Sequence, residues 1–240
     1  SLFSSTANAD LTKFFKRMGC EASTNAYSIT GSTPLVDSLL SVRYALYSEY
    51  IPNTDLVNYI QESGGTYLYE NLYTLPLGFV LPYDLADNWQ YQMENPAEVQ
   101  NDLCLLLGAD DVLVPVETEV SGSGCTFTAD MAGEYYVYIQ NKKVKNVKAS
   151  LPSGEKNFSN VDRGYLLEMG NLSEGSRITL TPGESGETLT AAVYRFSPRA
   201  MIQVYDRLDQ SPLHLDSWTD TKLTGTVSAA EAGTLFLSIP

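Results

Sequence analysis

The chain has 240 residues, which is enough for one large domain or two smaller ones. Apolar residues make up 43% of it, so a hydrophobic core can be buried. Its 15 Lys and Arg against 29 Asp and Glu give a net charge of −14. This negative field repels phosphate backbones and excludes nucleic acid as a partner.

No stretch of the sequence has the ~18 consecutive apolar residues that a membrane span requires. The two most apolar stretches, 72–81 and 103–116, are interrupted by Pro76 and by Asp110-Asp111. The opening Ser1-Leu2-Phe3 and the strand pattern of 233–240, which no turn or polar tail follows, predict a soluble piece cut from a longer protein.

Helix and strand patterns alternate in the first 110 residues. Asp10 can cap the first predicted helix, and Ser32 or Thr33 can cap the second, which has Pro34 in its first turn. Helices are predicted at 8–19, 33–41, 55–63 and 95–107, and strands at 42–47, 66–70 and 77–81.

From Val112 onward, apolar and polar residues alternate between short turn signals, which is typical of antiparallel strands. A turn at 140–143 predicts a hairpin between 135–139 and 144–147, and Ser197-Pro198 begins a helix that runs to Leu208. Strands are predicted at 112–120, 124–130, 133–140, 143–150, 163–168, 175–181, 187–196, 213–217, 221–228 and 234–239.

The predicted fold class is therefore α+β, mostly β. A small α/β part over residues 1–110 precedes an antiparallel β-sandwich of jelly-roll type over residues 111–240, with one helix packed across the sandwich.

The three cysteines, Cys20, Cys104 and Cys125, are interpreted as buried thiols. An odd number cannot form a complete set of intrachain disulfides, although one bridge remains possible by count. Because the sequence has a single histidine, His214, it does not predict a usual zinc site, and no motif predicts a cofactor.

A catalytic set is not evident in the sequence. His214 lies between two leucines of a predicted strand and is interpreted as a surface or packed side chain. Ser153-Gly-Glu-Lys156 matches a Ser-x-x-Lys pattern but lies in a turn, so it is interpreted as a hairpin tip. No catalytic residue is predicted.

Clustered charges are interpreted mainly as surface features. The acidic pairs can serve a glycosidase only if two carboxylates face each other across a groove, and the alternative is a solvated surface. The basic residues are interpreted as a charged hairpin edge, and the alternative is a surface that approaches an anionic head group. The acidic pairs are Asp110 with Asp111, Glu117 with Glu119, and Asp216 with Asp220, and the basic residues are Lys142, Lys143, Lys145 and Lys148.

Two tryptophans have the polar neighbours of a sugar-binding surface, where a ring stacks on the C–H face of a sugar and polar groups take its hydroxyls. The candidate glycan-binding residues are Trp89, Tyr91, Trp218 and Asp216. Packing in a core or between domains is the alternative role for these rings.

Three segments together carry a family resemblance: SITGSTPLVDSLLSVRYALY at 28–47, YENLYTLPLG at 69–78, and TGTV at 224–227 followed by GTLFLSIP at 233–240. This ordered set resembles the bacterial YfhO family of membrane proteins. The resemblance covers the chain from about residue 2 to residue 240, and its most specific parts are the second segment and the closing LSIP.

The resemblance implies a polytopic protein of the bacterial cell membrane with a transmembrane glycosyltransferase-like core that uses lipid-linked sugars. Members of the family are implicated in decorating cell-wall polymers such as lipoteichoic acid. This chain is similar to the large extracytoplasmic region, and no catalytic residue can be carried over to it.

The expected role is accessory to glycosylation, with the protein's own transmembrane region and a wall glycopolymer or lipid-linked sugar as partners. The alternatives are a structural or protein-interaction ectodomain that binds no glycan, and a free-standing hydrolase.

Overall fold

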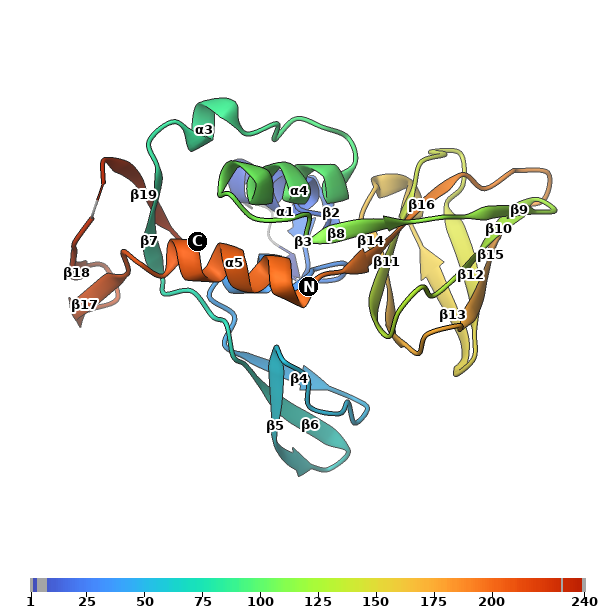
Figure 1. The fold of residues 1–240 in the computed structure, drawn as a ribbon, viewed down its shortest axis with the longest axis horizontal. Coiled ribbons are helices and arrows are strands. Elements are labelled where there is room, and N and C mark those ends of the chain that lie inside the picture. The colour runs from blue at the N-terminus through green and yellow to red at the C-terminus, as the bar shows by residue number, and fades with distance from the viewer. Residues whose placement is uncertain (1, 4–7, 230, 239–240) are drawn as a thin grey trace. The chain divides into compact units, whose positions relative to one another are not determined.

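The computed structural model describes residues 2–3, 8–229 and 231–238 (Figure 1). Strands take up 40% of the chain and helices 19%, which confirms an α+β fold that is mostly β. By contacts, the chain divides into two compact units, each built from three segments. The first unit lies within 1–32, 90–102 and 111–197, and the second within 33–89, 103–110 and 198–240.

Both units take residues from either side of residue 110. The predicted boundary between 1–110 and 111–240 stays a prediction.

The first unit contains a β-sandwich of two antiparallel sheets, drawn as two layers in Figure 1. The strand orders are β14-β11-β16-β8 and β13-β12-β15-β10-β9. The strands are β8 (Leu113–Val116), β9 (Glu119–Ser121), β10 (Gly124–Thr128), β11 (Gly133–Ile139), β12 (Asn146–Leu151), β13 (Gly154–Ser159), β14 (Leu166–Leu172), β15 (Arg177–Pro182) and β16 (Ala191–Phe196).

This order confirms the jelly-roll prediction. With β9 set aside as an addition at one edge, four strands lie in each sheet, and the first and last strands, β8 and β16, are neighbours. Such an order is that of two Greek keys wrapped on each other. The core between the sheets is formed by inward-facing residues such as Phe127, Tyr135, Val137, Leu167 and Ile178.

The outer face of the β14-β11-β16-β8 sheet is also buried, although one face of an antiparallel sheet is often open to water. Its buried outward residues are Leu113, Tyr136, Tyr138, Leu166, Tyr194 and Phe196. Other segments of the same unit bond to this face: the Asn95 amide donates to the Tyr194 hydroxyl at 2.6 Å, and the Tyr138 hydroxyl donates to the carbonyl of Glu94 at 3.1 Å.

The helix of the N-terminal segment of the first unit is α1 (Ala9–Arg17), as predicted. Its cap is Asn8 rather than the expected Asp10, because the Asn8 side chain accepts from the backbone N–H groups of Asp10 and Leu11. Gly19 ends the helix with φ +92, a left-handed conformation that suits glycine. A small sheet joins β1 (Leu2–Phe3), which precedes the helix, to β3 (Ala26–Tyr27) and β2 (Ala22–Ser23), which follow it.

The second unit is built from short sheets and helices. Its elements are α2 (Pro34–Leu39), β4 (Tyr44–Tyr47), β5 (Val57–Ser63), β6 (Thr66–Asn71), β7 (Gly78–Pro82), α3 (Leu85–Asn88), α5 (Pro198–Leu208), β17 (Leu213–Trp218), β18 (Leu223–Val227) and β19 (Gly233–Leu237). The helix α4 (Pro96–Leu106) has its first turns in the first unit and its last turn in the second.

The predicted helix at 55–63 is wrong, because this segment is strand β5, paired with β6. Gly64 and Gly65 both have positive φ, 58 and 78, and form a two-residue hairpin turn. Such a turn needs two residues with positive φ, so the glycine pair marks a hairpin rather than the end of a helix.

The predicted hairpin at 140–143 is also wrong, since the strands on either side of it lie in different sheets. β11 pairs with β14 and β16 on its two edges, so no edge is free for β12. β12 pairs with β13 instead, through a turn at 152–153, and this confirms the hairpin tip predicted at Ser153-Gly-Glu-Lys156.

The strands after residue 212 lie in two-stranded sheets outside the sandwich. β17 pairs with β18, and β19 pairs with β7, so the prediction that they complete the sandwich is corrected. The helix α5 is expected across the sandwich, but it belongs to the second unit, where it packs against α2 and β7. Position 239, the last of the predicted strand 234–239, lies outside the described residues.

Candidate functional site

The second unit has an open cavity of about 490 Å³ beside the three-stranded β4-β6-β5 sheet. This volume falls in the range of sites that hold small ligands, ~300–1,000 Å³. The cavity is lined by Ser41, Arg43, Glu70, Asn71, Leu72, Thr74, Leu75, Pro76 and Leu77.

Side chains that satisfy backbone groups hold the cavity in shape. Ser41 follows α2 with φ 58, an uncommon conformation for a residue other than glycine, and its hydroxyl donates to the carbonyl of Pro76 at 3.0 Å. The Asn71 amide and the Thr74 hydroxyl both donate to the carbonyl of Val42, at 2.7 and 3.4 Å. These bonds tie the start of β4 to the segment that follows β6.

An ion pair forms the charged part of the cavity wall. The Arg43 Nη2 and Nε atoms lie 2.9 and 3.0 Å from Glu70 Oε1, and the side chains are 64% and 32% exposed. The hydrogen bond with Glu70 raises the pKa of Arg43 above its usual value. The guanidinium carbon also lies 5.4 Å from the centre of the Tyr44 ring, within the range of a cation–π contact.

Leucine side chains form an apolar part of the wall. Leu72 and Leu77 are exposed, and Leu75 is buried behind the surface. The cavity therefore places hydrogen-bonding groups and hydrocarbon around one open space, which is the usual character of a small-molecule site.

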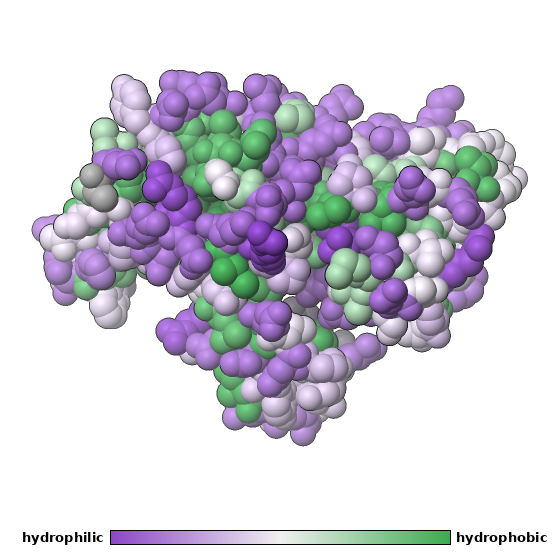
Figure 2. All heavy atoms as spheres, viewed as in Figure 1, coloured by the Kyte–Doolittle hydropathy of each residue, from purple (hydrophilic) through white to green (hydrophobic). Residues whose placement is uncertain are grey.

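The sheet beside the cavity differs between its two faces. One face carries Tyr44 and Leu46, which are 52% and 71% exposed, and Figure 2 shows apolar atoms at the surface where β4, β5 and β6 lie. The other face carries Tyr47, Tyr59, Tyr67 and Tyr69, which make ring contacts with one another or with Tyr50. An extended aromatic and aliphatic surface thus adjoins the cavity.

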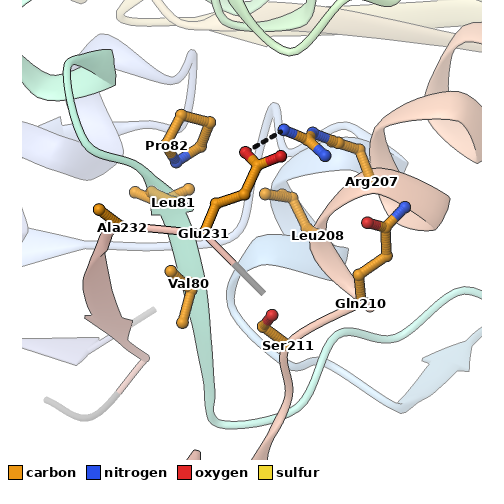
Figure 3. A pocket seen from close by; sticks show the side chains of 9 residues that line it. All are labelled: Val80, Leu81, Pro82, Arg207, Leu208, Gln210, Ser211, Glu231 and Ala232. Atoms are coloured by element: carbon orange, nitrogen blue, oxygen red, sulfur yellow. Dashed lines mark ion pairs between the residues drawn. The ribbon is translucent and has the colours of Figure 1, made fainter. Parts of the chain in front are cut away.

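A second cavity in the same unit, shown in Figure 3, has a volume of only about 60 Å³. Arg207 and Glu231 form an ion pair across its wall, with 3.5 Å between Nη2 and Oε2. This space is large enough for a few water molecules but too small for a sugar ring.

Trp218 and Asp216, two of the predicted glycan-binding residues, lie on β17. Trp218 is 73% exposed. Asp216 is the extra residue of a β-bulge, because Leu215 pairs with Gly225 and Ser217 with Thr224. Because of this extra residue, Trp218 lies on the same side of the hairpin as Leu215. The exposed His214 lies on the opposite side.

The other two predicted glycan-binding residues, Trp89 and Tyr91, belong to different units. Trp89 follows α3 in the second unit, and Tyr91 belongs to the first; both are half-buried. Burial raises the pKa of Tyr91 to about 12, and the Lys13 ammonium lies 5.9 Å from its ring centre. None of the four predicted residues lines either cavity.

The residues that line the larger cavity were not singled out by the sequence reasoning. A signal for them existed, since Arg43 and the stretch from Glu70 to Leu77 fall inside the two segments that carry the family resemblance.

The described residues contain no group of His, Cys, Asp and Glu side chains arranged to hold a metal ion. All three cysteines are buried thiols, as predicted, and burial raises the pKa of the Cys125 thiol. Among the described residues, one carboxylate, Glu70, lines the larger cavity, and one, Glu231, lines the smaller cavity. Neither cavity therefore has the acid pair of a glycosidase.

Comparison with protein families matches residues 1–113 and 116–240 to the bacterial membrane protein YfhO. The chain belongs to the YfhO family. This match confirms the resemblance carried by the three segments, two of which line the larger cavity of this YfhO chain. No curated protein and no solved structure matched the chain.

In the parts of this YfhO chain that the structure describes, every helix is too short or too polar to cross a membrane.

Proposed function

We propose that this YfhO chain is an extracytoplasmic region that binds a glycan, and so holds a wall-polymer acceptor or a lipid-linked sugar for a membrane-embedded glycosyltransferase part of the same protein. The observation that carries the proposal is the cavity between Arg43 and Leu77, which joins an ion pair to an apolar wall.

Sugars present hydroxyl groups at their rims and C–H groups on their ring faces. A site for them needs donors and acceptors on one side and apolar or aromatic surface on another. Arg43 and Glu70 provide the first, and Leu72 and Leu77 provide the second. The exposed Tyr44 beside Arg43 extends the surface for a longer chain of sugars.

The role is accessory rather than catalytic. The larger cavity has a single carboxylate, and that carboxylate is paired with Arg43. A general acid and base for sugar transfer would have to come from another part of the protein.

Titration of the protein with lipoteichoic acid fragments, followed by calorimetry or NMR, tests the proposal. We expect binding that Arg43→Ala weakens about tenfold, since a hydrogen bond to a charged group contributes ~1.5–3 kcal/mol. Trp218→Ala is the matched control and leaves binding unchanged. The proposal fails if the folded protein shows no binding at ~1 mM ligand. A Kd of ~1 mM corresponds to a binding free energy of only about −4 kcal/mol.

A second candidate function is a protein-interaction surface on the β17–β18 hairpin. Alternation around the bulge places Leu213, Leu215, Trp218, Leu223 and Val227 on one side, and the last three are exposed. Exposed apolar surface of this kind marks interaction sites. A photoreactive residue in place of Trp218 in the membrane-bound protein should then cross-link to protein, and a cross-link only to glycan or lipid would reject this function.

A further inference from the structure

We infer that the cavity between Arg43 and Leu77 selects an uncharged sugar and rejects the phosphate-bearing parts of a polymer or lipid. This inference rests on the proposed function and adds the chemical class of the ligand.

The charges around the cavity balance. Among the described residues that line it, Arg43 provides one positive charge and Glu70 one negative charge, and the two are in direct contact. The sequence has no other Arg or Lys between residues 33 and 89, while Asp37, Glu49 and Glu62 add negative charge to this stretch. The site therefore has no spare cation.

Phosphate groups are bound by unpaired guanidinium or ammonium groups or by free backbone N–H groups. A phosphate that reached Arg43 would have to displace Glu70 or share the guanidinium with it. Either arrangement brings two anions close together, and the net charge of −14 adds to the repulsion.

A neutral diol has no such conflict. Its two hydroxyl groups can accept from the guanidinium N–H groups and donate to the carboxylate, so the ion pair stays intact while it binds. Both contacts of Arg43 with Glu70 are made with Oε1. The exposed Leu72 and Leu77 then face the C–H groups of the ring.

Two kinds of probe separate these chemistries: uncharged trisaccharides, maltotriose and N,N′,N″-triacetylchitotriose, and a trimer of glycerol phosphate. We expect the native protein to bind at least one trisaccharide, with affinity that changes less than about twofold between ~50 and ~500 mM salt, because screening acts on charged ligands. The glycerol phosphate trimer should not bind.

The substitution Glu70→Gln reverses the preference. It leaves Arg43 unpaired, so trisaccharide affinity should fall about tenfold and salt-sensitive binding of the glycerol phosphate trimer should appear. Glu49→Gln is the matched control, because it removes an equal charge from an exposed position outside the cavity, and it should change neither affinity. Thermal unfolding of each variant confirms that it is folded.

The outcomes distinguish the inference from the proposed function. Salt-sensitive binding of glycerol phosphate by the native protein would overturn the inference and leave glycopolymer binding standing. Trisaccharide binding that survives both Glu70→Gln and Arg43→Gln would also overturn it, because the sugar would then bind elsewhere. If no probe binds the folded native protein at ~10 mM, the proposed function and the inference fail together.

Discussion

A single tyrosine hydroxyl closes the turn between β10 and β11. The Tyr135 hydroxyl lies 2.7 Å from Asp130 Oδ1 and 2.7 Å from the carbonyl of Met131, and Arg195 Nε lies 3.1 Å from the same Asp130 oxygen. Burial is the main reason that the pKa of Tyr135 rises to about 12. Partial burial alone would raise the pKa of Asp130, but the hydrogen bond from Tyr135 and the charge of Arg195 lower it below its usual 3.8.

The lowered pKa of Asp130 determines how its contribution to stability depends on pH. A carboxyl group with a lowered pKa in the folded state stabilises the protein above its unfolded pKa, and this contribution is lost as the pH falls through the folded value. The contribution of Asp130 is therefore complete near neutral pH and disappears as the pH falls below 3.8.

Tyr135→Phe should lower the free energy of unfolding by about 1–2 kcal/mol at pH 7, because a buried hydrogen bond to a charged group is lost while the ring stays. The loss of stability on going below pH 4 should be smaller in this variant and in Asp130→Asn than in the native protein. Urea denaturation at several pH values measures both effects.

Glu119→Gln is the control, since the Glu119–Arg177 pair is exposed and should contribute less than ~0.5 kcal/mol. Equal acid sensitivity in Tyr135→Phe and the native protein would contradict the role given to the hydroxyl.

At the scale of elements, the N-terminal segment is joined to β14 at a close backbone crossing. The Leu166 N–H donates to the carbonyl of Gly19 at 2.8 Å, and Gly31 lies against the same two backbones. A Cβ atom added to Gly31 would lie 2.5 Å from the Gly19 oxygen and 2.6 Å from the Leu166 oxygen. Only glycine fits there.

Gly31→Ala should therefore destabilise the first unit strongly. Left-handed strain costs ~1–2 kcal/mol, and overpacking against backbone adds ~1–3 kcal/mol. Gly175→Ala is the matched control, because its φ of +80 is close to the +83 of Gly31 but its added Cβ meets nothing within 4 Å. Thermal or urea unfolding measures the difference, and equal losses in the two variants would show that the crossing is not tight.

Helices and strands that depend on neighbouring residues could be predicted from the sequence, whereas the pairing of strands could not. Helix α1 and the strands of the sandwich follow from spacing and turn residues. The pairing of β12 with β13 rather than β11 depends on which edges are already taken, and no local pattern reports that. The cavity was missed for the same reason, because Ser41 and Pro76 meet only in the folded chain.

At the scale of the whole molecule, the first unit has two buried layers rather than one. The buried residues of the core between the sheets lie within 125–193, with Val116 packed against them, whereas the outer face of the β14-β11-β16-β8 sheet is covered by segments from elsewhere in the chain. The unbroken apolar run from Tyr135 to Ile139 is the sequence signal for burial on both faces.

A fragment of residues 111–197 should fold as a sandwich and then self-associate. Tyr136, Tyr138 and Tyr194 alone would expose roughly 450–750 Å² of ring surface, as much as the largest patch of a typical monomer. Circular dichroism reports folding, and light scattering after size-exclusion chromatography reports the association.

Tyr138→Lys together with Tyr194→Lys should restore a monomer in the fragment. A fragment that is monomeric without these changes would contradict the structural role given to the outer face.

The crossing at Gly19 also has a consequence for biosynthesis. The ion pair between Glu21 and Arg163 joins positions that are 142 residues apart. At ~5–20 residues per second, a ribosome needs on the order of 10 s to make the intervening chain. Helix α1 can pack early against β2 and β3 of its own segment, but the crossing at Gly19 cannot form until β14 has been made.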